Sequence, residues 1–121
     1  VAGIPDRQAA SFGQPRPDLA AALKDVPPGV PVILLAHRPE GAAQHARAGV
    51  ALQLSGHTHG GQILGPHLLT QWANEGFVSG LYRVGSMLLY VSNGTGLWNG
   101  LAIRLGRPSE ITRIVLRAEK P

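Results

Sequence analysis

Three of the five histidines of this chain follow segments that read as apolar strands. His37 comes directly after residues 30–36 (VPVILLA), and His57 and His59 follow residues 50–55 (VALQLS) through Gly56. A neutral imidazole is a common metal ligand, and three of them are enough for a zinc-type site that keeps an open position. These histidines therefore predict a metal site, with the alternative that they are surface residues or are satisfied by nearby carbonyl groups.

Glycines surround the second and third of these histidines, in the string SGHTHGG at residues 55–61. Two histidines that are one residue apart in a loop can both turn their rings toward one or two ions. Glycine has no Cβ, so the backbone on either side can approach an ion closely. This local pattern favours metal binding over the surface alternative.

The elements around the histidines predict that they meet. A helix is expected over residues 18–25, and a strand over residues 30–36 because the run is apolar and rich in branched side chains. A helix over residues 40–48, closed by Gly49, and a strand over residues 50–54 then complete a β-α-β unit. Such a unit has parallel strands, whose carboxyl ends lie at one edge of the sheet, where ligands bind in open α/β sheets.

The second half of the chain reads as short strands separated by glycine, proline, asparagine and serine. We expect strands over residues 78–83, 87–91, 101–105 and 111–116, with the first two joined in a hairpin at Gly85 and Ser86. Residues 1–17 are expected to form a loop, because proline and glycine interrupt any periodicity. The fold class is α/β in a single domain over residues 1–121, a β-α-β unit followed by mainly antiparallel strands.

Other residues of chemical interest have plainer interpretations. Arg38 follows His37 and can contact an anionic substrate through its forked guanidinium, or it can face solvent. His45 and His67 are expected to be ordinary surface residues. The loop over residues 92–100 is expected to be a tight turn, with the alternative that it forms a wall of the site and that Trp98 shapes access.

Composition excludes several classes of protein. The 121 residues include no cysteine, which excludes disulfide scaffolds and thiolate zinc sites, and 44% are hydrophobic, which argues against disorder. The net charge of +4 comes from dispersed arginines, so we predict no nucleic-acid partner. The longest apolar stretch, residues 30–36, is too short to cross a bilayer. Because the chain opens on Val1 in a loop-like segment, we expect a fragment or a processed product.

Several segments of the sequence resemble those of a known family. Gly56-His57-Thr58-His59 is similar to the GHxH motif of calcineurin-like metallophosphoesterases, and residues 35–40 (LAHRPE) resemble the segment that carries the family's preceding single histidine. Residues 80–82, 89–96 and 108–111 resemble the strands and loops of a bacterial branch that is often preceded by a membrane or export segment. The resemblance covers nearly the whole chain.

The resemblance implies roles for the three histidines. His37 and His57 match the ligands of one ion of a dinuclear site, and His59 matches a ligand of the other. The implied ions are manganese, iron or zinc, and the implied reaction is hydrolysis of a phosphomonoester or phosphodiester, in which paired metals stabilise the attacking and leaving oxygens. Arg38 is the candidate substrate-binding residue.

The chain also departs from the family. The earlier motifs D-x-H, G-D-x-x-D and G-N-H-[ED] are absent, and Asp6 falls where the family has a variable loop. We therefore expect the C-terminal half of an α/β/β/α sandwich, able to hold at most one ion and inactive alone, because repulsion between two ions would be uncompensated. The general acid and the bridging carboxylate would lie in the missing half.

The absence of the earlier motifs determines which partners we expect and leaves a second function open. An exposed apolar surface is expected, covered by the missing half or by self-association. The alternative function is a non-catalytic half-domain that serves as a metal-binding or interaction module. For the full-length protein the resemblance implies a cytoplasmic, membrane-associated or exported location in bacteria.

Overall fold

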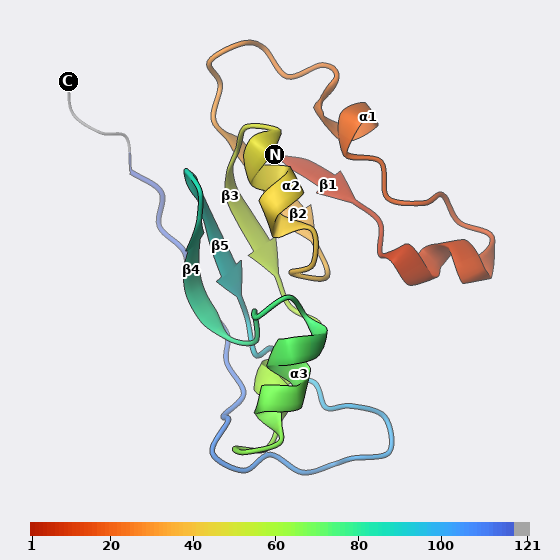
Figure 1. Ribbon diagram of the computed structural model, residues 1–121, viewed down its shortest axis with the longest axis vertical. Helices are drawn as coiled ribbons and strands as arrows, with labels where there is room; N and C mark the ends of the chain where they lie inside the picture. Colours follow the sequence, from red (N-terminus) through yellow and green to blue (C-terminus); the bar gives the residue numbers. More distant parts are fainter. Residues whose placement is uncertain (118–121) are drawn as a thin grey trace.

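A single five-stranded sheet organises the chain in the computed structural model, which describes residues 1–117 (Figure 1). The strand order is β1-β2-β3-β5-β4, and every neighbouring pair is parallel except β4 and β5. The strands are β1 (Ala2–Ile4), β2 (Val32–Ala36), β3 (Val50–Ser55), β4 (Gly80–Val84) and β5 (Met87–Val91). The helices are η1 (Arg7–Phe12), α1 (Leu19–Leu23), α2 (Ala42–Arg47), η2 (His59–Gly61) and α3 (His67–Ala73).

The predicted β-α-β unit is confirmed. β2 and β3 are parallel, with Leu34 opposite Gln53, and α2 connects them. β2 begins at Val32 rather than at residue 30, since Pro31 has no N–H to donate to the sheet. Gly49 follows α2 with a φ of 86°, a left-handed conformation that suits glycine at the end of a helix.

The first residues form more structure than the sequence predicted. Residues 2–4 were expected in a loop, but they form β1 and pair in parallel with β2. A strand of three residues is too short to show periodicity, so sequence patterns miss it. The predicted helix after Asp18 is confirmed as α1, and the Asp18 carboxylate accepts a hydrogen bond from the N–H of Ala21 at 2.9 Å.

The predicted second half is confirmed in its antiparallel hairpin and differs in its later strands. β4 and β5 form the expected hairpin, but β5 joins the sheet in parallel with β3. Leu101 and Leu105 form only isolated bridges, with Trp98 and Ile63, and residues 111–116 form no strand. No sequence pattern predicted α3, which begins after Pro66.

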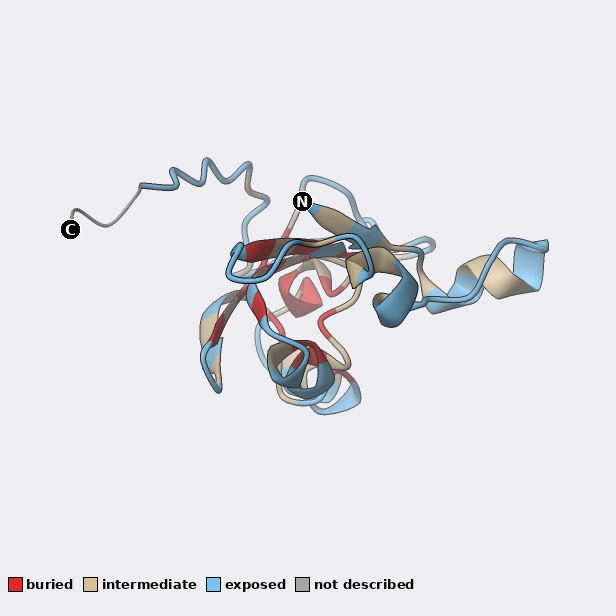
Figure 2. Ribbon diagram, turned by 90° about the horizontal axis from the view of Figure 1, so that it is seen from above, coloured by how far each residue is buried: buried red, intermediate tan, exposed pale blue. Residues whose placement is uncertain are grey.

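The core lies on one face of the sheet. Alternate residues of the central strands point to this face and are buried together with Ala42 of α2. The core residues of the strands are Val32, Leu34, Ala36, Val50, Met87, Leu89 and Val91. Figure 2 shows the buried residues concentrated along the sheet and in α2. Of the helices formed by residues 1–117, none is long and apolar enough to span a membrane.

The opposite face of the sheet remains open to solvent. Leu35, Leu54, Tyr90 and Leu81 are register partners across four adjacent strands, so their side chains share that face. Leu35 is 48% exposed and Leu81 is 64% exposed. An open hollow of about 620 Å³ lies over this face, between the sheet and the segment at residues 110–114. The expected exposed apolar surface is therefore present in this chain.

Candidate metal centre

The carboxyl ends of β2 and β3 bring His37 and His57 together. The N–H of Gly56 donates to the carbonyl of His37 at 3.0 Å, which joins the two loops that follow these strands. The two imidazole rings lie edge to face, with centroids 5.2 Å apart. The juxtaposition that the β-α-β pattern predicted is thus present, although 20 positions separate the two histidines in the sequence.

Asp6 completes this cluster and is the site residue that the sequence missed. Asp6, His37 and His57 each offer a ligand atom, and these three atoms all lie within 4.8 Å of one another. Asp6 lies in the loop that follows β1, and this strand brings it to the same edge of the sheet, two residues beyond Ile4. The signal available was a carboxylate directly after a short apolar segment, AGIP, in an otherwise polar region.

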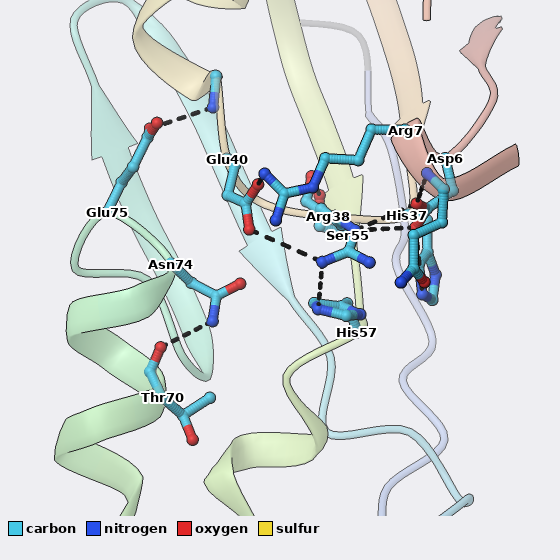
Figure 3. Close-up of polar contacts among 12 residues, drawn as sticks. Asp6, Arg7, His37, Arg38, Glu40, Ser55, His57, Thr70, Asn74 and Glu75 are labelled. Atoms are coloured by element: carbon cyan, nitrogen blue, oxygen red, sulfur yellow. Dashed lines mark hydrogen bonds and ion pairs between the residues drawn. The ribbon is translucent and has the colours of Figure 1, made fainter. Parts of the chain in front are cut away.

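Arg38 lies between the carboxylate and the histidine. Its Nε donates to both carboxylate oxygens of Asp6, at 3.2 and 3.0 Å, and its Nη1 donates to Nε2 of His57 at 2.8 Å (Figure 3). The side chain is only 13% exposed, so it faces the cluster rather than solvent. Glu40 continues the network, with Oε1 3.9 Å from Nη1 of Arg38 and Oε2 2.7 Å from Nη1 of Arg7.

This arrangement shifts the pKa values of two members of the cluster. Burial, the Arg38 guanidinium and His37 together lower the pKa of His57 from 6.5 to about 4. Burial alone would raise the pKa of Asp6, but hydrogen bonds from the Gln8 N–H and from Arg38, with the charge of Arg38, hold it below its usual value. At neutral pH the cluster therefore contains a carboxylate and a neutral imidazole, the states that metal ions require.

The ligand atoms of Asp6, His37 and His57 fit a divalent ion. The hydrogen bond from Arg38 to His57 must break before His57 can bind that ion. A metal at Nε2 would replace the hydrogen bond from Arg38. A metal at Nδ1 of neutral His57 would leave the proton on Nε2, where it would face the Arg38 N–H. Either mode of binding separates Arg38 from His57.

His59 lies apart from this three-residue cluster. Its Nδ1 is 2.9 Å from the carbonyl oxygen of Gly96, and its ring centroid is 6.3 Å from that of Trp98. His57 and His59 both have left-handed backbone conformations, with φ values of 69° and 50°. Such values are uncommon outside glycine and often occur at functional sites, where the surrounding structure holds them in place.

Known proteins similar to this chain share a family name. An uncharacterised metallophosphoesterase of Campylobacter jejuni is 40% identical over 121 residues, which is 99% of this chain and 32% of the relative. The transmembrane protein with metallophosphoesterase domain of Danio rerio is 40% identical over 97% of this chain and 28% of its own length. An uncharacterised metallophosphoesterase of Bacillus subtilis is 36% identical over 84% of this chain and 36% of the relative.

The chain belongs to the metallophosphoesterase family. It spans about a third of the length of these relatives, in agreement with a C-terminal portion of a metallophosphoesterase. No family model and no solved structure matches it.

Buried polar residues hold in place the loop that follows β2 and contains Arg38. Gln53 is fully buried, and its Nε2 donates to Ser55 Oγ at 3.0 Å and to the carbonyl of Arg38 at 3.3 Å. Its Oε1 is 2.8 Å from Nδ1 of His45. The expectation that His45 is a surface residue is wrong, since it is 7% exposed and supports the site from α2.

The loop over residues 92–100 forms a wall beside the metallophosphoesterase histidines. Trp98 and His57 both line a hollow of about 350 Å³, whose other wall is α3. Trp98 is the residue of this loop that lines the hollow, and whether it shapes access to a site stays a prediction. His67, by contrast, lies in α3, where its Nδ1 accepts a hydrogen bond from the N–H of Gly65 at 2.9 Å.

Proposed function

We propose that this chain contributes to a metal-dependent hydrolase of phosphomonoesters or phosphodiesters. One observation carries the proposal: a carboxylate and two imidazoles converge at the carboxyl edge of a parallel sheet, in a chain of the metallophosphoesterase family. Oxygen and nitrogen ligands of this kind suit manganese, iron and zinc. Divalent ions at such a site supply Lewis acidity and a metal-activated water for attack on phosphorus.

The proposed roles follow from the positions of the residues. His37 and His57 bind one ion, with Asp6 within reach of both. His59 contributes to a second ion, as its match to the GHxH motif implies. Arg38 is the proposed substrate-binding residue, because its guanidinium can bind two phosphoryl oxygens in parallel. When Arg38 leaves Nε2 of His57, its donors become available to an anion beside the site.

We further propose that the complete site needs polypeptide beyond this chain. Two ions held close together need bridging negative charge, and Asp6 is the one carboxylate among residues 1–117 that lies within the histidine cluster. The apolar rows on the open face, centred on Leu35 and Leu54, offer a surface on which that polypeptide can pack. Self-association of this chain through the same face is the alternative, and light scattering at high concentration distinguishes a dimer from a monomer.

A non-catalytic metal-binding or interaction module is the second candidate function. The observation that favours it is Arg38, whose guanidinium hydrogen-bonds to both Asp6 and His57 and so satisfies the groups that an ion would bind. Metal analysis of longer polypeptides that include residues 1–121 tests this candidate. A content of one ion per chain, or none, would support it.

The test of catalysis is hydrolysis of bis(p-nitrophenyl) phosphate with Mn²⁺ by a polypeptide that carries the residues encoded upstream of Val1. We expect turnover from that polypeptide, none from residues 1–121 alone, and a loss of at least about 100-fold for His57→Ala. The matched control is His67→Ala, which changes a histidine outside the cluster. Unchanged turnover in His57→Ala would contradict the proposal.

For the full-length protein we propose association with a membrane or export, with a cytoplasmic location as the alternative. Vertebrate relatives that are named transmembrane proteins support it. Fractionation of cells into membrane and soluble extracts, with an antibody against this chain, separates the two.

A further inference from the structure

The Arg104 guanidinium is enclosed by backbone carbonyls from three separate segments. Its Nη1 donates to the carbonyl of His59 at 3.0 Å, across 45 positions of the sequence. Its other acceptors are the carbonyls of Arg107 at 3.2 Å, Asn93 at 2.9 Å, Gly94 at 3.3 Å and Gly96 at 2.6 Å. One side chain thus joins the loop that contains His59 to the loop that faces it.

One of these carbonyls also contacts the His59 ring. The oxygen of Gly96 lies 2.6 Å from Nη2 of Arg104 and 2.9 Å from Nδ1 of His59. A carbonyl oxygen has two lone pairs and can only accept, so Nδ1 of His59 must carry the proton and donate. The His59 ring packs beside residue 96, where an added Cβ would lie 3.4 Å from Cε1 of His59.

We propose that Arg104 is a positioning residue that acts through the Gly96 carbonyl to hold His59 in its Nδ1–H tautomer, with Nε2 presented to a metal ion. The proposal rests on the proposed function for the role of Nε2. Metal-binding histidines usually donate their other ring N–H to a carbonyl or carboxylate, which fixes the tautomer and the orientation of the ring.

The chemistry of arginine suits this position. A planar guanidinium carries five donors in a fixed fork and can satisfy several carbonyls at once, whereas a lysine ammonium is a point charge with three donors. Arg104→Lys therefore keeps the charge but loses the geometry that fixes the Gly96 carbonyl. A residue that only braced the two loops would change stability without setting the tautomer of His59.

The experiment measures the ring nitrogens of ¹⁵N-labelled histidine by NMR in residues 1–121, without metal and during titration with Zn²⁺. In the wild type we expect His59 protonated at Nδ1, with Nε2 unprotonated. Arg104→Lys should give a mixture of the two His59 tautomers, because the lysine ammonium cannot hold the Gly96 carbonyl in the same geometry. Arg113→Lys, a matched change in an exposed segment, should behave as the wild type.

Two results overturn the proposal: a wild-type His59 protonated at Nε2, or a folded Arg104→Lys variant with the wild-type tautomer. The first needs no variant, so the proposal stays testable even if Arg104→Lys unfolds in a thermal melt. A third result is possible: the wild type shows the expected tautomer, but Zn²⁺ shifts no histidine resonance. That result counts against the proposed function and still supports the positioning of His59.

Discussion

Arg38 donates to Nε2 of His57 at 2.8 Å and thereby occupies a nitrogen that a metal ion would use or depend on. The same guanidinium forms its second contact with Asp6, through Nε at 3.0 Å from Oδ2. The guanidinium of Arg38 therefore neutralises the negative charge that Asp6 brings to the cluster. Because Arg38 and a divalent ion both carry positive charge, they compete for Asp6 and His57.

Removing the charge of Arg38 should strengthen metal binding. A divalent ion and a guanidinium about 4 Å apart repel each other by roughly 2 kcal/mol even in water, so Arg38→Met should tighten binding of Zn²⁺ or Mn²⁺ by at least about tenfold. Isothermal calorimetry on residues 1–121 measures this. The control is Arg7→Met, whose side chain pairs with Glu40 and is 64% exposed. Weaker binding in Arg38→Met would show that Arg38 assists the ion instead.

Removing the charge of Asp6 should have the opposite effect. Asp6→Asn keeps an oxygen that can accept from the Gln8 N–H, a bond of 2.7 Å in the wild type, but it loses the carboxylate. We expect metal affinity to fall by at least roughly tenfold. Asp25→Asn is the matched control, because Asp25 is 88% exposed and lies outside the cluster. If calorimetry gives equal affinities for both variants, Asp6 is not part of the metal site.

The depressed pKa of His57 predicts how stability depends on pH. Folding lowers this pKa from 6.5 to about 4, so the folded state binds fewer protons than the unfolded state between these values. The contribution of His57 to the free energy of unfolding is fully present above pH 6.5 and is lost as the pH falls toward 4.

NMR of the Cε1 proton measures this titration directly. We expect a midpoint for His57 near 4 in the wild type and a higher midpoint in Arg38→Met, because part of the shift comes from the Arg38 charge. A wild-type midpoint at 6.5 would mean that His57 is neither buried nor beside a cation in solution.

The buried Gln53 side chain should matter for stability. Gln53→Leu removes the partners of His45 and Ser55 and leaves buried polar groups without hydrogen bonds. The expected loss in the free energy of unfolding is about 1–3 kcal/mol. Urea denaturation measures it, with the exposed Gln44→Leu in α2 as the control. Equal midpoints for the two variants would contradict the role of the buried network.

The meeting of His37 and His57 was more predictable than the sheet around them. The apolar runs before His37 and His57 show two parallel strands directly, and parallel strands must end at the same edge. Asp6 was missed because β1 has three residues and is defined by pairing with β2, a long-range contact that leaves no periodic pattern. His45 was misplaced for a similar reason, since only its contact with Gln53 shows that this face of α2 is buried.

The predicted strands in the second half failed for another reason. Residues 111–116 alternate as a strand does, but the alternation says nothing about whether a neighbouring strand is available. In the structure every residue from 111 to 116 is exposed. The role of Arg104 was also invisible in the sequence, because its acceptors are backbone carbonyls, which are the same for every residue type.

Whether His37 and His57 share one metal ion can be measured directly, by identifying which histidines bind an ion. Zn²⁺ titration of ¹⁵N-histidine-labelled residues 1–121, with His57→Ala and His67→Ala beside the wild type, resolves each ring by NMR. We predict that His37 and His57 shift together at the lowest Zn²⁺ concentrations, that His57→Ala abolishes the shift of His37, and that His67→Ala leaves both unchanged. A Zn²⁺ response that first appears at His67, or a His37 shift that persists in His57→Ala, would contradict this prediction.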